Sequence, residues 1–286
     1  MKKKVLIVVN KNWECEPFLE GFKANIPNEP LVFLSPMSKD NYMSSCRAEY
    51  HFDKYDVVVR CIQDLMDPDK GKSNSEEKYR VLPGFISAEK PDLVISVSTA
   101  ESTPEGKNNL NGCVVFGGQY FMFNAKNFDP SSQSSLTVPE RMRICAYDKK
   151  LFDILDDDLC KRAGAKFKKP EYHPADVMRI EASPDFACVG VVNVEDYKAY
   201  EEADPAAYKA YPKNHAENPP MSIETTHGIV RMSTPKEVSV IFVSPIVDRY
   251  KSFAEDVKGE QNEYCSYNAG VAVAEYIKQI NEHCIV

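Results

Sequence analysis

The chain has 286 residues, of which 27% are charged and 43% hydrophobic, and its formal net charge is −8 at pH 7. This composition is typical of a folded globular protein and excludes an intrinsically disordered chain. The acidic balance argues against nucleic acid or an anionic membrane as a partner, because both require a concentrated basic surface. We therefore expect a small-molecule partner, with no nucleic acid and no membrane.

The first residues, MKKKVLIVVNKNWE, place basic side chains before an apolar run at Val5–Val9. That run is too short for a signal peptide and is followed by charged residues, so we interpret it as a strand. No stretch approaches the roughly 18 apolar residues of a transmembrane helix. The nine cysteines form no C-x-x-C pair, which predicts reduced, mostly buried thiols in the cytoplasm and no metal site.

Short runs of β-branched and aromatic residues alternate with helix-like stretches along the chain. Helices are expected from Glu16-Pro17 onward, over residues 74–88, and from Glu263 to Asn281, where apolar residues recur with helical spacing. This alternation predicts a single α/β domain over residues 1–286, a three-layer αβα sandwich with a central mixed, largely parallel sheet. The predicted strands are Val5–Val9, Val57–Arg60, Leu93–Val97, Val114–Phe116, Tyr120–Asn124, Phe186–Asn193 and Val238–Val243.

Two segments rich in Pro, Ser, Ala and Asn predict long loops, at residues 128–140 and 201–220. Long loops in compact domains often form lids or rims of functional sites. A solvated insertion is the other interpretation, and we favour it for residues 128–140.

Three acidic positions stand where predicted elements meet. Asp248 follows the strand Val238–Val243 and lies beyond Pro245, which lacks an N–H and should end the ladder. Glu224 precedes a probable helix, and either Glu14 or Glu16 follows the first strand. A single sheet could bring these junctions to one edge. Each acid also has a purely structural explanation, as a loop cap, a helix-dipole partner or an N-cap.

The order of the segments resembles the purine nucleoside phosphorylase and nucleosidase superfamily, which includes the methylthioadenosine/S-adenosylhomocysteine nucleosidases. The resemblance covers most of the chain and implies the αβα fold described above. The segments that carry it are KVLIVVNKNWECEPFL, KPDLVISVSTAES, NGCVVFGGQYFMFNA (similar to the family's hairpin), FACVGVVNVEDYKAY, SIETTHGIVR (similar to its Met-Glu helix), IFVSPIVDRY and CSYNAGVAVAEYI.

The resemblance implies roles for individual residues at the base and the sugar. Asp248 occupies the position of the catalytic Asp that protonates or hydrogen-bonds N7 of the purine. Glu224 matches the Glu that holds the ribose hydroxyls, with Ile223 in place of the usual Met under the sugar. Tyr197 is similar to the aromatic residue that stacks on the base.

The resemblance also implies a nucleophile end of the site. Glu16, with Glu14 as the less favoured alternative, falls near the acid that orients the attacking water. Ser98 and Thr99 lie in the small-residue loop that contacts the nucleophile or the sugar. These roles suit the chemistry, because breaking an N-glycosidic bond requires a proton donor at the base and hydrogen bonds at the sugar.

The chain departs from the family pattern in three places. Val247 replaces the Ser that normally precedes the catalytic Asp, and Glu101 stands where glycine is usual. The segment NKNWECE lacks the glycine-rich turn with which phosphorylases hold phosphate. These departures favour water over phosphate as the nucleophile, although inorganic phosphate stays a possible co-substrate; no cofactor is expected.

The leading interpretation is an enzyme that cleaves the N-glycosidic bond of a purine-type nucleoside. The alternative is a non-catalytic nucleoside-binding or storage protein on the same scaffold, and a third is another α/β enzyme with a similar strand order. By analogy with the family, we expect a homo-oligomer. His227, close after Glu224, could be a base near the site, but we favour a partly buried helix histidine whose hydrogen bonds are satisfied.

Overall fold

The computed structural model describes residues 2–27, 47–66, 75–104, 109–125, 143–144, 149–193, 197–211 and 219–283. Within these ranges, no helix is both long enough and apolar enough to cross a membrane. The predicted loop at residues 128–140 lies outside the described residues. The six cysteines whose surroundings are described are all buried and unpaired by disulfides, in agreement with the expectation of buried thiols.

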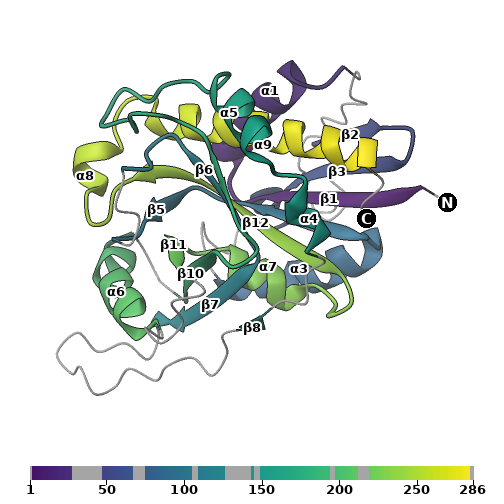
Figure 1. Cartoon of the computed structure of the whole chain (residues 1–286). Coiled ribbons are helices and arrows are strands. Elements are labelled where there is room, and N and C mark those ends of the chain that lie inside the picture. Colours follow the sequence, from purple (N-terminus) through teal and green to yellow (C-terminus); the bar gives the residue numbers. More distant parts are fainter. Residues whose placement is uncertain are drawn as a thin grey trace.

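A twisted mixed sheet forms the centre of the molecule (Figure 1). Its strands are hydrogen-bonded in the order β2-β3-β1-β4-β12-β5-β11-β10-β7-β8, and β6 and β9 extend it beside β12. The strands are β1 (Lys3–Val9), β2 (Ala48–His51), β3 (Tyr55–Cys61), β4 (Leu93–Val97), β5 (Ala100–Ser102), β6 (Val114–Gly117), β7 (Gln119–Asn124), β8 (Arg143–Ile144), β9 (Ile180–Ala182), β10 (Ala187–Val192), β11 (Pro220–Glu224) and β12 (Ser239–Asp248).

Helices cover both faces of this sheet (Figure 1). One layer holds α1, α5 and α9, and the opposite layer holds α3 and α7. The helices are α1 (Asn12–Ala24), α2 (Ile62–Leu65), α3 (Ser75–Glu89), α4 (Lys150–Asp153), α5 (Asp157–Gly164), α6 (Tyr197–Ala210), α7 (His227–Ser233), α8 (Phe253–Asp256) and α9 (Gln261–His283). The predicted three-layer αβα sandwich is confirmed.

The alternation of side chains along β1 explains why both faces are covered. Val5 and Ile7 belong to the core beneath α1 and α9, whereas Leu6 and Val8 belong to the core beneath α3 and α7. Because successive strand residues point to opposite faces, an uninterrupted apolar run requires a helix layer on each side. The run Val5–Val9 therefore encodes a central parallel strand, as its register with β3 and β4 shows.

The predicted loop at residues 201–220 is wrong over its first half, where α6 runs to Ala210. Pro205 suggested a break in the sequence, but the helix accommodates it. Ala203 and Ala207 are spaced one turn apart and pack on Phe121 and Val189 in a third core. An apolar face buried on the sheet outweighs the cost of an internal proline. Residues 212–218 lie outside the described residues.

Three further predictions about elements are corrected. β12 continues through Pro245 to Asp248, because Pro245 lies where the strand passes from pairing with β4 to pairing with β5, so its missing N–H interrupts neither ladder. β6 and β7 do not form a hairpin: β6 pairs with β12 and β9, and β7 pairs with β10 and β8. Helix α1 begins at Asn12, earlier than expected, with Pro17 inside it.

Candidate active site

Glu14 forms a polar cluster at the carboxyl ends of β1 and β4. Its Oε2 accepts a hydrogen bond from the Lys11 backbone N–H at 2.7 Å, which caps the start of α1. Its Oε1 accepts from both the backbone N–H and the hydroxyl of Thr99, each at 2.7 Å. Ser98 lies beside this cluster, where its hydroxyl accepts a hydrogen bond from Asn10. The structure thus brings Glu14, Ser98 and Thr99 together.

Glu16 points away from this cluster. Its side chain is 76% exposed and lies 3.9 Å from Arg47. Together with Trp13, it lines an open groove between α1 and α9. The two candidates differ because position 14 is the third residue of the helix and turns inward, whereas position 16 turns outward; Glu14 alone reaches the strand ends.

Burial raises the pKa of Glu14, against the opposing effect of the hydrogen bonds from Thr99 and Lys11. A carboxyl group with a raised pKa is a better proton acceptor than an ordinary one once it is ionised. Its position and basicity both suit a group that activates a nucleophile.

Glu224 ends β11 and caps the following helix, α7. Its carboxylate accepts hydrogen bonds from the backbone N–H groups of Thr226 and His227. The Cys188 thiol, 3.3 Å from Oε1, donates a further one. These contacts fix a buried carboxylate at the strand ends, and they leave acceptor capacity on Oε2 for a ligand hydroxyl.

A buried lysine lies between the two acids, and the sequence analysis did not identify it. Lys78 on α3 donates a hydrogen bond to the Thr226 hydroxyl at 2.8 Å. Burial lowers its pKa to about 8, and the charges of Glu224 and Glu14 partly oppose that change. In the sequence, Lys78 stands among charged residues typical of an exposed helix face, so no local pattern could reveal its burial.

His227 is a structural residue, as predicted. It is fully buried, and its Nδ1 and Nε2 lie 2.8 Å and 3.0 Å from the hydroxyls of Ser96 and Ser244. Burial lowers its pKa, which favours the neutral ring. Cys188, Glu224 and His227 have ligand atoms close enough to hold a metal ion. Because these atoms are already engaged in the hydrogen bonds described above, the cluster is better explained as a protein network.

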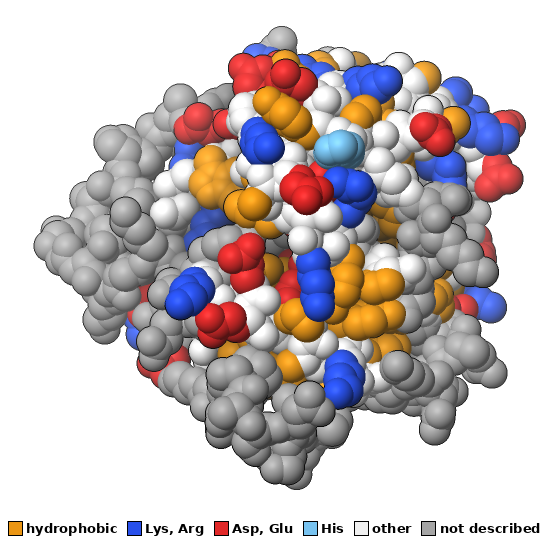
Figure 2. Space-filling view, turned by 90° about the vertical axis from the view of Figure 1, so that its left-hand side faces the viewer, with side chains coloured by type: hydrophobic (Ala, Val, Ile, Leu, Met, Phe, Trp, Pro, Cys, Tyr) orange, Lys and Arg blue, Asp and Glu red, His pale blue; other side chains and the backbone are white. Residues whose placement is uncertain are grey.

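Asp248 lines a pocket of about 290 Å³ at the end of β12. The pocket opens on the side of the molecule where α6 and α8 lie, and Figure 2 shows that this side carries interspersed acidic, basic and hydrophobic side chains. The residues that line the pocket are Glu101, Tyr200, Glu201, Asp204, Pro205, Asp248, Lys251 and Phe253.

Burial raises the pKa of three carboxyl groups of this pocket, those of Glu101, Asp204 and Asp248. Burial raises the pKa of Asp248 well above its ordinary value, and the charges of Asp256 and Asp204 raise it further. Burial and the adjacent carboxyls of Asp204 and Asp248 raise the pKa of Glu101 to about 10. A carboxyl that stays protonated near neutral pH can donate a proton to a departing base.

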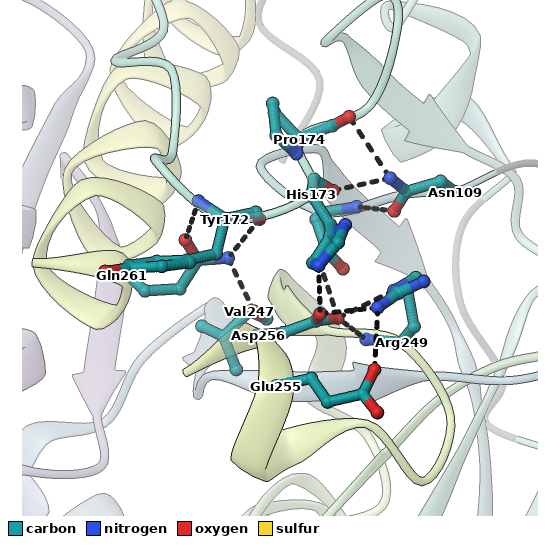
Figure 3. A network of polar contacts seen from close by, with 10 residues as sticks. Asn109, Tyr172, His173, Pro174, Val247, Arg249, Glu255, Asp256 and Gln261 are labelled. Atoms are coloured by element: carbon teal, nitrogen blue, oxygen red, sulfur yellow. Dashed lines mark hydrogen bonds and ion pairs between the residues drawn. The ribbon is translucent and has the colours of Figure 1, made fainter. Parts of the chain in front are cut away.

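A polar network behind the pocket holds the end of β12 in place (Figure 3). Gln261 on α9 donates to the Val247 carbonyl at 2.8 Å. Arg249 donates to Asp256 through its backbone N–H at 2.9 Å and through two guanidinium nitrogens at 2.9 and 2.8 Å. These contacts fix the residues on either side of Asp248, so its carboxyl is presented to the pocket from a rigid support.

The sheet order places Asp248 on β12 and Glu224 on β11, the two strands on either side of β5. Glu101 on β5 pairs with Asp248 on one side and with Ile223 on the other. Adjacent strands are about 4.8 Å apart, so the backbones of Asp248 and Ile223 are about 10 Å apart. Tyr200 links the two sides, because it lines the Asp248 pocket and its hydroxyl donates to the Ile223 carbonyl at 3.3 Å.

Two predicted binding residues are placed as follows. Ile223 is fully buried among the residues that pack on α6. Tyr197 is the first residue of α6, and its side chain lies outside the description. One turn later, Tyr200 lines the pocket, as does Phe253 on α8. Sequence reasoning missed Asp204 because it assigned residues 201–220 to a loop, and in the segment FACVGVVNVEDYKAY it chose Tyr197 rather than Tyr200 as the aromatic residue.

The comparisons with known proteins give the fold. No protein-family model and no curated protein sequence matches the chain. Among solved structures, a 5′-methylthioadenosine/S-adenosylhomocysteine nucleosidase from Neisseria meningitidis, in complex with methylthio-immucillin-A, is 16% identical with a TM-score of 0.59, and the match covers 96% of this chain and 99% of that one. The chain has the nucleosidase fold.

Other structures with this fold match as extensively. The nucleosidase from Colwellia psychrerythraea in complex with adenine has a TM-score of 0.58 at 10% identity, over 98% of this chain and 96% of that one. Futalosine hydrolase of Helicobacter pylori has a TM-score of 0.52 at 14% identity, over 99% of both chains. The resemblance inferred from the sequence is thereby confirmed at the level of the fold.

Proposed function

We propose that this protein cleaves the N-glycosidic bond of a purine-type nucleoside by hydrolysis. The observation that supports the proposal is the burial of three carboxyl groups, those of Glu14, Glu224 and Asp248, next to strand ends in a nucleosidase fold. All three carboxyl groups are buried, which is costly unless a ligand or a hydrogen-bond network uses them.

The three acids would divide the reaction among them. Asp248, whose pKa is raised well above its ordinary value by burial, donates a proton or hydrogen bond to the departing base. Glu224 accepts hydrogen bonds from the ribose hydroxyls and stabilises the positive charge that develops on the sugar. Glu14 orients a water molecule and accepts its proton as it attacks C1′. Tyr200, at the Asp248 pocket, offers a flat face to the base.

Water suits the nucleophile end better than phosphate. The two Thr99 donors that an anion could use are both engaged by Glu14. The Glu14 carboxylate would also repel phosphate, although Lys78 supplies one nearby positive charge. Phosphorolysis is therefore the less favoured form of the same reaction.

Chromatography of a nucleoside panel, with and without phosphate, tests the proposal. Hydrolysis releases free base and ribose in phosphate-free buffer, whereas phosphorolysis releases ribose 1-phosphate only when phosphate is added. The Asp248→Asn variant should lose about 10²–10⁴-fold in kcat, the usual contribution of a general acid. The exposed Asp158→Asn on α5 is the matched control. Unchanged turnover in Asp248→Asn would refute the role of Asp248.

A non-catalytic nucleoside-binding protein is the second candidate function. It is favoured by the hydrogen bonds with which the protein already satisfies much of the Glu224 carboxylate. A binder would be stabilised thermally by a nucleoside or free base, because a ligand of the native state shifts the unfolding equilibrium. Stabilisation without any release of base would support this function over the enzyme.

A further inference from the structure

The pocket at Asp248 has more carboxyl groups than basic groups. Glu101, Glu201, Asp204 and Asp248 line it, and Lys251 is the one basic side chain among its lining residues. The backbone N–H of Lys251 donates to Glu101, so that carboxyl is anchored to the pocket wall. Like charges this close repel one another unless they share protons or a positive ligand separates them.

Asp204 gives a second and independent indication of a ligand. Its side chain is only 3% exposed, and Oδ1 has no hydrogen-bond partner among the described residues. A buried carboxylate oxygen without a donor is unfavourable, and native proteins rarely keep one without a use. Because Asp204 lines the pocket, a ligand in the pocket can supply the missing donor or positive charge.

We propose, on the basis of the function proposed above, that this pocket is specific for a positively charged nucleobase, such as that of an N-alkylated purine nucleoside. Asp248 contacts one edge of the heterocycle, and Glu101 and Asp204 lie against the positive ring. A neutral nucleoside fits the same pocket less well, because only a cation can replace the protons that reduce the repulsion among these three carboxyl groups.

The chemistry of cleavage is consistent with this charge pattern. In a cationic nucleoside, the electron pair of the C1′–N bond moves to the ring nitrogen, and the base leaves as a neutral molecule without an added proton. Positive charge passes to the sugar, beside Glu224, and water adds to C1′ while losing a proton to Glu14. A neutral purine reaches the same state by taking a proton from Asp248 before it leaves. The acid pocket thus stabilises a cationic base in either case.

The product is held less tightly than the substrate. Once the bond is broken, the base is neutral, so Glu101 and Asp204 can bind protons again and no longer attract the base. Release of the neutral base therefore follows from the same charges that bind the cationic substrate.

The test uses 1-methyladenosine, which is cationic at neutral pH, and adenosine, which is neutral and nearly the same size; 7-methylguanosine and guanosine form a second pair. The measured quantity is the ratio of kcat/KM for the cationic to the neutral member. Because cationic nucleosides are intrinsically more labile, the ratio is compared between protein variants. Asp204→Asn and Glu101→Gln should lower it by at least about tenfold relative to wild type, and the exposed Glu16→Gln should not.

The outcomes separate this inference from the proposed function. A ratio that stays the same in Asp204→Asn and Glu101→Gln, for both pairs, overturns the cationic pocket even if neutral nucleosides are cleaved. If a variant cleaves nothing, Kd is measured by calorimetry for the cationic and the neutral member of each pair. The ratio of affinities is then compared between variant and wild type in place of the ratio of kcat/KM. If wild type cleaves no nucleoside, the proposed enzyme fails, and the ratio of Kd values still decides the specificity of the pocket.

Discussion

Glu14 and Glu16 differ by two positions in the sequence but have opposite surroundings in the fold. Glu14 is buried against Thr99, whereas Glu16 lies in an open groove on the outer side of α1. Replacing Glu14 by Gln removes the proton acceptor but preserves the shape of the side chain. If Glu14 activates water, kcat should fall by about 10²–10⁴-fold, the range for general bases.

The matched change Glu16→Gln removes the same charge from an exposed position. It should leave kcat within a factor of about two, since surface substitutions away from a site have small effects. Steady-state assays of both variants on one nucleoside compare them directly. Equal losses in the two variants, or no loss in Glu14→Gln, would contradict the assignment of Glu14.

At the residue scale, the sequence indicated the acids but not the residues that tune them. Asp248 and Glu14 each follow a predicted strand and Glu224 precedes a predicted helix, so their position at junctions between elements could be predicted. Lys78 and Asp204 lie on helices, among other charged residues, and only tertiary packing turns them inward. The choice between Glu14 and Glu16 likewise depends on where α1 begins, which a capping interaction with Lys11 decides.

At the scale of elements, the tightest contact is the crossing of α1 and α9. A Cβ added to Gly270 would lie 2.0 Å from the Phe18 carbonyl oxygen, and one added to Gly21 would lie 2.2 Å from the Tyr267 carbonyl oxygen. These glycines let the two backbones touch. Gly270→Ala should therefore destabilise the protein by about 1–3 kcal/mol or more, because the helices must separate.

Gly84 on α3 provides the control, because nothing lies within 4 Å of a Cβ added there. Gly84→Ala should stabilise the protein by about 0.5–1 kcal/mol, the usual gain from replacing a glycine inside a helix. Urea unfolding of both variants measures the two changes. Stabilisation by Gly270→Ala would show that α1 and α9 do not approach as closely as described.

The elements that sequence patterns predicted well are those whose burial is uniform. β1 contains the buried apolar run Val5–Val9, β4 is buried along its whole length, and α9 carries a continuous apolar face, so the sequence pattern of each element has one clear interpretation. The failures, α6 and the end of β12, both contain a proline. In each case, the proline would break an isolated helix or strand, but contacts with distant parts of the chain stabilise the element in the fold.

At the scale of the whole molecule, the fold is shared with nucleosidases at 10–16% identity. This fold could be predicted from the order of the segments along the chain. Proteins that share the fold place the same strand ends at one edge of the sheet, so the corresponding segments must follow one another in the same order. The pairing of β6 and β7 could not be predicted in the same way. Neighbours in the sequence suggested a hairpin, but both strands pair with partners distant in sequence.

Buried acids with raised pKa values should make the whole protein less stable as pH rises. Glu101 has an ordinary pKa of 4.5 in the unfolded chain and about 10 in the fold. Between these values the native state binds the extra proton, so the free energy of unfolding falls as pH increases through this range. A glutamine at position 101 does not titrate, and its carbonyl can still accept the Lys251 N–H.

Glu101→Gln should therefore raise Tm by little near pH 4.5 and progressively more toward pH 9. Each kcal/mol of stabilisation corresponds to about 2–4 °C in a chain of this size class. Thermal unfolding of wild type and variant across this pH range, followed by circular dichroism, measures the difference. A gap in Tm that does not change with pH would mean that Glu101 titrates normally in the fold. A difference in Tm that grows with pH would mean that Glu101 makes the native protein less stable, as residues at functional sites commonly do.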